Sequence, residues 1–585
     1  MSRSDDQLRI RPGRVRSKGS SAGKARSFVG QVLRAAQKSG HIGKRFGGSN
    51  GGKSSFGRGR FAAASAAMRG QSRRVVIKTR VARHSGARFR SAPLATHIAY
   101  LERDGAGRDG KPGRLFDAEH DDIDGRAFAD RCEEDRHHFR FIVSPEDADQ
   151  MADLQGFTRD LLRQAETDLG TRLDWVAVAH HNTDNPHVHI LVRGRTDDGA
   201  DLVVSRDYIG RGLRSRAEAL VSLELGPRTA LEIEAGLRRE VTADRWTRLD
   251  RALLSHADET GGLIDLRPGS PALADAALRN PLLGRAQHLE RLGVAEQIGP
   301  AQWSLASDAE ATLRALGERG DIIKRMHRVL SRNGQAPSVA DFAIHFEDAP
   351  AVIGRLAERG LQDELSGSAY VVIEGVDGRA HHLRFPSLET TGDGNVGAVV
   401  EARPFEGADG RRRMTLSVRS DLTLEEQIAA PGATWVDRQL VGRHDAPAAV
   451  SGFGAEVREA MERRTDHLAS EGLARRTGEG AMFSRDLLSS LRRRELDATA
   501  ARLASATGLA HQPSAEGDHV SGVYRQRVNL SSGRFAMIDN GLGFELVPWK
   551  PALEQKLGQQ VSGVMAPGGG VDWSFGRKRG LGLTA

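Results

Sequence analysis

The sequence predicts an α+β protein: an antiparallel sheet with flanking helices, preceded by a basic arm and followed by mixed α/β modules. Apolar residues alternate in several short stretches and recur every three or four positions in the segments between them. Alternation places one face of a strand in the core, whereas the longer spacing is typical of an amphipathic helix. With 585 residues, the chain also exceeds the roughly 250–300 residues that one hydrophobic core supports. We therefore expect several domains.

The N-terminal segment differs from the rest in charge. Residues 1–90 hold 23 Lys and Arg but only two Asp, a net charge of +21, which leaves −13 for the remainder of a chain whose net charge is +8. Such a block typically binds a polyanion, most often nucleic acid, although a solvated tail is the alternative. Residues 1–72 are rich in Gly, Ser, Arg and Lys and cannot bury enough apolar surface to fold. We expect this arm to be mostly disordered.

Composition also excludes several classes of protein. No apolar run approaches the ~18 residues of a membrane span, so we expect no membrane insertion. The N-terminus lacks the apolar core of a signal peptide. The single cysteine, Cys132, cannot form an internal disulfide and fits a reducing cytosol.

Order should begin at RRVVIKTRVAR, and the elements that follow define an α+β domain over residues 73–230. Ser144 should cap a helix that has Pro145 at its first position and ends near Leu169. NTDNP between the last two strands is a turn composition, so these strands should form an antiparallel hairpin. Strands are expected over 73–83, 137–148, 174–181 and 187–194, and further helices over 93–105 and 211–225.

The expected hairpin carries four histidines within ten positions. His187 and His189 lie two residues apart and share a face, and His180 ends the preceding strand, where it can approach the same point. His181 is one position out of phase and should point away. Three imidazoles make an open metal site, which suits Zn, Fe, Ni or Cu better than Mg. The alternatives are ordinary core or surface histidines, and a nucleotide-binding pattern whose third histidine is missing because position 191 is Leu.

The remainder of the chain contains one internal repeat. Residues 288–305 and 467–485 share a helix with His-Leu, a tight turn and two short strands with an aromatic residue before Ser. This order is typical of the end of a winged helix, although a generic helix–hairpin unit is equally compatible with it. The Gly-rich, basic residues 561–585 should be a flexible tail. The expected regions are 1–72 (basic arm), 73–230 (α+β domain), 231–340 (helical, candidate winged helix), 341–430 (β-rich), 431–510 (helical, candidate winged helix) and 511–585 (C-terminal segment and basic tail).

Three motifs together resemble those of conjugative relaxases of the mobilisation class, members of the HUH endonuclease superfamily related to T-DNA border endonucleases. His180 with PHVH at 186–189 resembles their third motif, and THIAYLERDG resembles the first, with Tyr100 at the position of the nucleophile. Ser144 in FRFIVSPEDA resembles the DNA-contacting Ser of the second. The motifs are specific in combination and weak apart. The rest of the chain, including GRFAMIDNGLGFELVPWKPALE, resembles relaxases with a long C-terminal domain of unknown function.

The resemblance implies an HUH nicking domain that cuts one DNA strand by tyrosine transesterification. Tyr100 would attack the scissile phosphodiester at an origin of transfer and form a 5′-phosphotyrosyl link. A divalent metal ion would be held by His180, His187 and His189; the family favours Mg or Mn, whereas ligand type favours Zn or Ni. The implied partners are single-stranded DNA at the origin, accessory nicking proteins, a coupling protein and a type IV secretion system. The implied location is the bacterial cytoplasm, with transfer to a recipient cell.

Other residues receive less specific roles. Tyr208 competes with Tyr100 as the nucleophile, although packing or DNA contact suits it better. The family commonly has Asp where this chain has Asn182, so an acid that supports the metal ligands should come from GRLFDAEHDDIDGR. Asp117 and Glu119 are its first candidates, and a solvated acidic loop is the alternative reading. The candidate DNA contacts are Ser144, Arg211, Arg214 and Arg216, and the residues that resemble a secretion signal are Arg577, Lys578 and Arg579.

Two rival functions remain open. One is a rolling-circle replication initiator or single-strand transposase with the same chemistry, against which the C-terminal resemblance argues. The other is a non-enzymatic DNA-binding accessory protein with a structural metal. Tyr100 and an open three-histidine site argue against it, because a structural zinc site normally closes with a fourth ligand.

Overall fold

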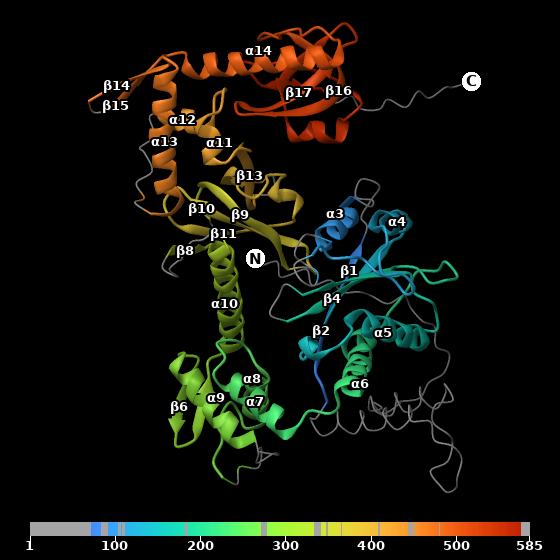
Figure 1. Cartoon of the computed structure of the whole chain (residues 1–585). Coiled ribbons are helices and arrows are strands. Elements are labelled where there is room, and N and C mark those ends of the chain that lie inside the picture. Colours follow the sequence, from blue (N-terminus) through green and yellow to red (C-terminus); the bar gives the residue numbers. More distant parts are fainter. Residues whose placement is uncertain are drawn as a thin grey trace. The chain divides into compact units, whose positions relative to one another are not determined.

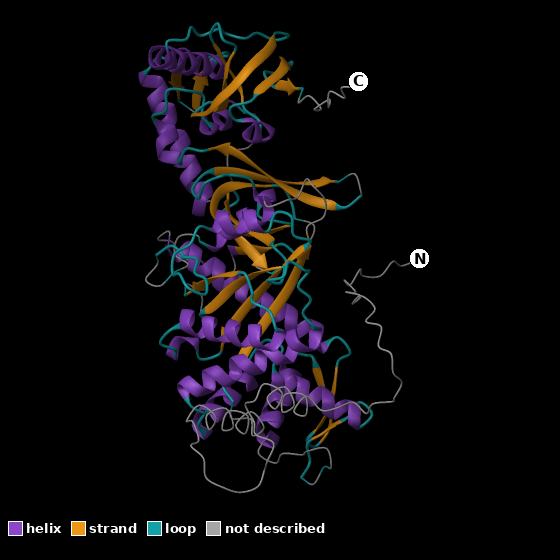
Figure 2. Cartoon of the chain, turned by 90° about the vertical axis from the view of Figure 1, so that its right-hand side faces the viewer, coloured by secondary structure: helices purple, strands orange, loops and turns teal. Residues whose placement is uncertain are grey.

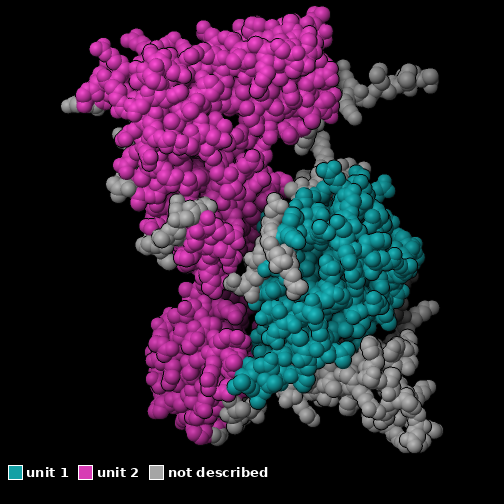
Figure 3. Space-filling model, in the orientation of Figure 1, with its two compact units in different colours: residues 1–233 teal, residues 234–585 magenta. Residues whose placement is uncertain are grey.

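The computed structural model divides the chain into two compact units, residues 1–233 (unit 1) and 234–585 (unit 2) (Figure 3). Residues 1–71 of the basic arm, Asn182 and the cationic tail over 575–585 lie outside the described residues. No described helix is long and apolar enough to span a membrane. The described residues are 72–83, 92–102, 107, 111–181, 185–268, 270, 278–332, 341–346, 349–363, 365–407, 410–442, 449, 451–478 and 480–574.

Unit 1 is built on a four-stranded sheet in which every neighbouring pair is antiparallel. The strand order is β1-β2-β4-β3, so the β3–β4 hairpin lies at one side of the sheet. The strands are β1 (Val75–Arg83), β2 (His137–Pro145), β3 (Trp175–His180) and β4 (His187–Arg193). The expected antiparallel sheet is therefore confirmed.

Helices cover both faces of this sheet (Figure 1). Phe141 and Ile190 belong to a core shared with α5 and α6, and we call this side the α5 face. Val178 and Leu191 point the other way and pack with α3 and α4, which we call the α3 face. The helices are α3 (Ala92–Leu101), α4 (Gly125–Arg131), α5 (Leu154–Leu169) and α6 (Leu213–Leu225).

The start of α5 differs from the prediction. Ser144 does not cap a helix, because it pairs with Val76 of β1 and the strand β2 continues to Pro145. Helix α5 begins at Leu154, where the carboxylate of Asp153 accepts a hydrogen bond from the backbone N–H of Gln155. Pairing with β1 thus overrides the local Ser-Pro helix signal. The helix does end at Leu169, as expected.

The first part of unit 2 combines four helices with a small sheet and then a six-stranded sheet. Figure 2 shows the helices and strands of the described residues coloured by type. The sheet orders are β5-β7-β6 and β13-β12-β9-β10-β11-β8. The elements are α7 (Ala230–Val241), which crosses the division between the units, α8 (Arg248–Glu259), β5 (Ile264–Asp265), α9 (Arg279–Arg291), β6 (Ala295–Gly299), β7 (Gln302–Leu305), α10 (Ala309–Arg332), β8 (Phe342–Ile344), β9 (Val352–Asp363), β10 (Ser368–Gly375), β11 (Ala380–Phe385), β12 (Val399–Glu406) and β13 (Arg412–Ser420).

The second part of unit 2 ends in a five-stranded sheet of order β18-β17-β16-β19-β20. The predicted flexible tail is wrong as far as Trp573, because Val561 and Val571 are buried in this sheet. The elements are α11 (Leu424–Ile428), α12 (Trp435–Val441), α13 (Gly452–Ser470), β14 (Ala474–Thr477), β15 (Gly480–Phe483), α14 (Leu487–Thr507), β16 (His519–Leu530), β17 (Gly533–Asp539), β18 (Phe544–Pro548), β19 (Gln560–Met565) and β20 (Val571–Trp573).

Candidate metal centre

The three predicted histidines come together through strand register and alternation. His180 ends β3 and pairs directly with His187 at the start of β4, while His189 lies two residues further along β4. Directly paired residues and residues two apart share a face, so all three imidazoles project from the α3 face. Their exposed fractions are 0%, 9% and 3%. The hairpin therefore builds a buried cluster of imidazoles.

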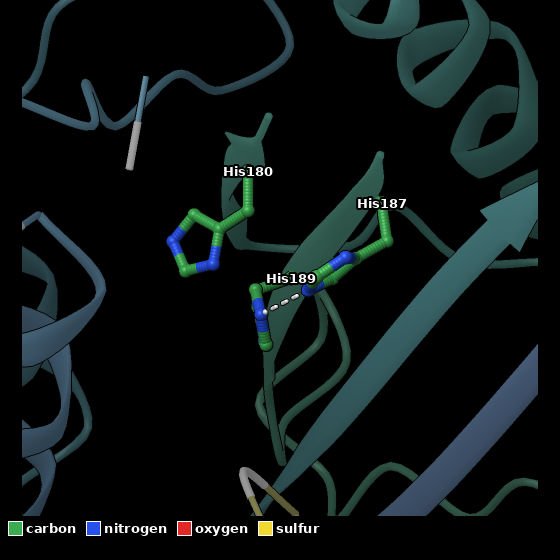
Figure 4. A group of neighbouring side chains, drawn as sticks. All are labelled: His180, His187 and His189. Carbon is green, nitrogen blue, oxygen red and sulfur yellow. Dashed lines mark hydrogen bonds between the residues drawn. The ribbon is translucent and has the colours of Figure 1, made fainter. Parts of the chain in front are cut away.

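The ring nitrogens are close enough together to hold one ion (Figure 4). One nitrogen of each ring lies within 4.8 Å of the other two, and Nε2 of His187 is 3.1 Å from Nε2 of His189. Two nitrogens each about 2.1 Å from a metal and about 90–109° apart are separated by about 3.0–3.4 Å. This pair fits coordination. In the described part of the chain no other group of three His, Cys, Asp or Glu meets the same condition, and His181 is not a member.

Backbone carbonyls fix the orientation of two of the rings. Nε2 of His180 lies 2.9 Å from the carbonyl oxygen of Leu101, and Nδ1 of His187 lies 3.0 Å from that of Asn185. A carbonyl oxygen only accepts, so these nitrogens carry the proton of the neutral rings. Nδ1 of His180 and Nε2 of His187 then hold the lone pairs. Metal-binding histidines usually have such a second partner, so the residues fit a divalent ion.

Helix α3 places Tyr100 on the same face of the sheet as the histidines. Tyr100 is half-buried and packs against the apolar cluster that includes Val178 and Leu191. The next residue, Leu101, supplies the carbonyl oxygen that holds His180. The helix that carries the predicted nucleophile therefore ends at the histidine cluster.

Tyr208, the competing nucleophile, lies on the opposite side of the sheet. It packs against the core of the α5 face, and its hydroxyl donates a hydrogen bond to Oδ2 of Asp168 at 3.1 Å. Burial and the nearby Asp168 carboxylate both raise the pKa of Tyr208 above its ordinary value. Ionisation of this tyrosine is thus disfavoured. Both its position and its partner favour a packing role.

Ser144 belongs to the histidine side by strand register. Strands β2 and β4 pair as far as Val143 opposite Val188, so Ser144 lies at the end of the sheet where His187 begins β4. Val143 is part of the α5-face core, and alternation puts its neighbour Ser144 on the α3 face. The motif serine and the histidines therefore share one end and one face of the sheet.

The three predicted arginine contacts fall into two groups. Arg211 and Arg214 are exposed, and Arg211 is ion-paired with Asp207. Arg216 instead donates hydrogen bonds to both carboxylate oxygens of Asp168, at 2.7 and 3.0 Å. Since Asp168 lies in α5, this bond fastens α6 to α5. Arg216 is thereby engaged within the fold, whereas Arg214 and Arg211 face solvent.

The two predicted acids belong to a local turn. Oδ1 of Asp117 accepts hydrogen bonds from the backbone N–H groups of Glu119 and His120, at 2.8 and 2.7 Å. Burial raises the pKa of Asp117, but these hydrogen bonds outweigh it and hold the pKa below its usual value. Glu119 is exposed. Neither residue is in the three-histidine group formed by the described residues.

Sequence reasoning missed Glu102 and the carbonyls of Leu101 and Asn185. Glu102 follows the end of α3, and burial, with the nearby carboxylates of Asp124 and Asp122, raises its pKa. A carboxyl with a raised pKa is a better proton acceptor near neutral pH than an ordinary one. Its position in THIAYLERDG, two residues after Tyr100, was the available signal. No sequence signal could have indicated the two carbonyls, because every residue carries a backbone carbonyl.

Comparison with protein families places the C-terminal part of the chain. Residues 282–412 and 402–582 match the family described as "Protein of unknown function (DUF3363)". Together these segments span just over half of the chain, so the chain belongs to this family. Neither the curated proteins nor the solved structures include a match. The family match lies in unit 2, so the histidine cluster of unit 1 has to be interpreted from its own geometry.

Proposed function

We propose that unit 1 is a DNA relaxase domain that nicks one strand at an origin of transfer through Tyr100. The observation that carries this proposal is the placement of three separate motifs on the α3 face: the Tyr100 helix, Ser144 and the buried histidines. Nicking needs a nucleophile, a strand contact and a cation site within reach of one phosphate. A structural metal site would need neither the tyrosine nor the serine.

The proposed reaction is a transesterification. The hydroxyl oxygen of Tyr100 bonds to phosphorus, the bond between phosphorus and the 3′ oxygen breaks, and the tyrosine proton passes through a base to that oxygen. The products are a 5′-phosphotyrosyl strand and a free 3′-hydroxyl. The new ester keeps the energy of the phosphodiester, so the reverse reaction can rejoin the DNA. A tyrosine ordinarily ionises at a pKa of about 10, so a base is needed, and Glu102 with its raised pKa is the nearest candidate in sequence.

The residues of the site divide this work. His180, His187 and His189 would hold a divalent ion, which when bound reduces the charge on the nonbridging phosphate oxygens. The carbonyls of Leu101 and Asn185 keep two of the imidazoles oriented. Neutral ligands leave the full charge of the ion available to the phosphate. Ligand type favours Zn or Ni and the resemblance favours Mg or Mn, and metal titration separates them.

Further proposals concern the partners. Single-stranded DNA at the origin is the substrate, and the net charge of +21 on residues 1–90 supports additional phosphate contacts by the basic arm. Accessory nicking proteins, a coupling protein and a type IV secretion channel would follow from the relaxase role. The protein would then act in the bacterial cytoplasm and travel with the DNA strand.

The helix–hairpin units of unit 2 support a second proposal, that they are winged helices. In the first of these helix–hairpin segments, α9 lies between β5 and β6 along the chain. Strand β7 pairs with both β5 and β6. A helix followed by a two-stranded wing is how a winged helix-turn-helix ends. The second segment has the helix α13 and the wing β14-β15, which is two-stranded in the described residues. The wing residues Ile298 and Met482 are 57% and 66% exposed, as a contact surface requires.

The relaxase proposal is tested by trapping the covalent adduct. The purified full-length protein is incubated with a single-stranded oligonucleotide that carries its own origin, together with a divalent metal, and the products are separated on a denaturing gel. Wild type and Tyr208→Phe should form the adduct, and Tyr100→Phe should not, because Phe keeps the ring but lacks the hydroxyl. An adduct with Tyr100→Phe would point to another nucleophile. No adduct with wild type, where a known relaxase cleaves its own origin, would reject the proposal.

A further inference from the structure

Unit 2 contains the same order of elements twice. Copy 1 runs from α7, whose first residues belong to unit 1, to β13 (residues 230–420), and copy 2 runs from α11 to β20 (residues 424–573). In order, each copy has three helices, a β-hairpin, a long helix and a sheet whose first strand has 12 residues. Copy 1 also has the short strand β5 between its second and third helices. The likeness therefore extends far beyond the helix–hairpin repeat that the sequence reveals.

A buried arginine occupies the same position in both copies. Arg285 in α9 and Arg464 in α13 each bind both oxygens of one aspartate, and that aspartate also closes a capping box with a Thr three residues before it. Each guanidinium also donates to three carbonyls spaced two residues apart. The partners are Asp250 with the carbonyls of Val241, Ala243 and Arg245 in copy 1, and Asp437 with those of Ile428, Ala430 and Gly432 in copy 2.

The two sheets share one topology. In each, the strands lie in the order third, second, first, fourth, fifth, and a short segment before the first strand pairs in parallel with the third. A short 3-10 helix separates the third strand from the fourth, at Glu389–Thr391 in copy 1 and Pro551–Lys556 in copy 2. In copy 1 the end strands β11 and β13 approach each other. These features match a five-stranded Greek-key barrel of the OB type.

Glycine marks the same crossing point in both sheets. A Cβ atom on Gly354 of β9 would lie 2.0 Å from the carbonyl oxygen of Glu374, and one on Gly522 of β16 would lie 2.4 Å from that of Asp539. Neither position admits a side chain, because the backbone of the second strand passes too close. The same approach of first and second strands is therefore built into both copies.

The copies differ at the hairpin between the fourth and fifth strands. In copy 1 residues 403–406 and 410–413 of the β12–β13 hairpin are exposed, and Phe405 is 44% exposed. Phe405 pairs directly with Arg413, and Arg403 shares their face because it lies two residues from Phe405. We call Arg403, Phe405 and Arg413 the arm face. In copy 2 the corresponding residues 560–573 include no Lys or Arg.

The charge of the arm face is favourable for an anionic partner. Its base holds the buried Glu401, which is ion-paired with both Arg403 and Arg419, so the acid is already matched. Arg413 adds a further cation beside the aromatic ring. The opposite face of the hairpin instead sets Arg412 directly across from Glu406.

We propose that the arm face binds single-stranded nucleic acid, with a base stacked on Phe405 and phosphates beside Arg413 and Arg403. Barrels of the OB type bind oligonucleotides with the loop between their fourth and fifth strands. An exposed aromatic ring among cations suits single strands, whose unpaired bases are free to stack. The second strand does not offer a competing surface at Tyr370 and Val372, which are buried under α10. The arm face lies in unit 2 and does not depend on the relaxase proposal.

The test maps where a single strand contacts the full-length protein. An oligo(dT) that carries 5-iodouracil is crosslinked by ultraviolet light, and the adducts are located by mass spectrometry. We expect an adduct at Phe405, which single-stranded competitor removes and excess duplex does not. No adduct within residues 399–420, or equal competition by duplex, would overturn the proposal.

Charge reversal on the two faces of the hairpin gives a matched pair of variants. Arg413→Glu should raise the oligonucleotide concentration that half-saturates the Phe405 adduct by about 10-fold, because a phosphate contact is lost and replaced by repulsion. Arg412→Glu makes the same charge change on the other face and should shift it less than about twofold. Equal shifts in both variants would mean non-specific attraction and would overturn the assignment of the face. Adducts in unit 1 are read separately, so a failed relaxase proposal leaves this result interpretable.

Discussion

Two buried polar groups, one in each unit, are arranged in opposite ways. In unit 2 the guanidinium of Arg464 and the carboxylate of Asp437 are both fully buried, and each satisfies the other at 2.8 and 2.9 Å. In unit 1 the imidazoles of His180, His187 and His189 are buried with nitrogens directed at one another. In the first arrangement the two charges compensate each other, whereas the second brings together nitrogen lone pairs that suit an added cation.

This difference distinguishes a buried group that fixes the fold from one that suits ligand binding. A buried ion pair is costly to desolvate and adds no reactivity, so its benefit is to fix geometry. Its repetition as Arg285 with Asp250 in the other copy supports that role. The three clustered imidazoles have no opposite charges to attract one another, and backbone carbonyls hold two of them instead. Their cost in burial makes sense where a ligand is to be bound.

Removing the arginine of the buried ion pair should have the largest effect on stability. Arg464→Ala leaves the Asp437 carboxylate buried without its cation, which should lower the free energy of unfolding by about 3–5 kcal/mol. Urea unfolding of the full-length protein, followed by circular dichroism, measures the loss. The matched control is the preceding residue of α13: Arg463→Ala removes an exposed ion pair with Glu425 and should leave the midpoint unchanged.

Cys132 shows whether that loss is confined to unit 2. Burial raises the pKa of its thiol to about 12, so the native thiol should resist alkylation, and labelling reports unfolding of unit 1. Labelling in Arg464→Ala should stay as slow as in wild type. A loss of stability in Arg463→Ala as large as in Arg464→Ala would contradict a special role for the buried pair.

Removing one histidine of the cluster should affect metal binding more than folding. His187→Ala removes a proposed ligand, so affinity for Zn or Ni should fall by more than the ~10–100-fold that follows loss of a ligand's supporting partner. Competition with a chromophoric chelator measures the affinity, and metal-free unfolding should change little. His181→Ala is the control, because this neighbour lies outside the cluster. Equal weakening by both substitutions would show that the site is not the one described.

The convergence of the histidines could be predicted from the sequence, because alternation along a strand follows from backbone geometry alone. The wrong prediction that Ser144 caps a helix could not be avoided from the sequence. The competing interaction is with Val76, 68 residues away in the chain. Arg285 resembles an ordinary surface residue of a helix, and its partner Asp250 lies 35 residues earlier. Only the fold brings such pairs together.

The C-terminal sheet was missed for a different reason. Its last hairpin contains Gly563 and the run Gly568–Gly570, and glycine both weakens the alternating pattern and is typical of flexible segments. In the structure these strands are held by pairing with β16, so the apolar residues between the glycines become buried. Tertiary pairing again supplied what the local composition did not indicate.

The smallest effect is expected at an ion pair between the two copies of unit 2. Asp393 of copy 1 contacts Arg527 and Arg534 of copy 2, each at 2.6 Å. Burial raises the pKa of Asp393, but the two guanidinium groups outweigh it, so the pKa lies below its ordinary value. A carboxyl with a lowered folded pKa stabilises the fold above its unfolded pKa of about 3.9, and this contribution is lost as the pH falls through the folded value.

Asp393→Asn isolates this contribution. Because the side chain of Asp393 is 46% exposed, solvent screens the pairs, and each should contribute only about 0.2–1 kcal/mol. Wild type should be more stable than the variant at pH 7. The difference should shrink as the pH is lowered below about 3.9, the ordinary pKa of an Asp side chain. Urea unfolding at several pH values measures it. A difference that stays constant across this range would mean that Asp393 acts through packing, and that unlike Asp437 it owes nothing to its charge.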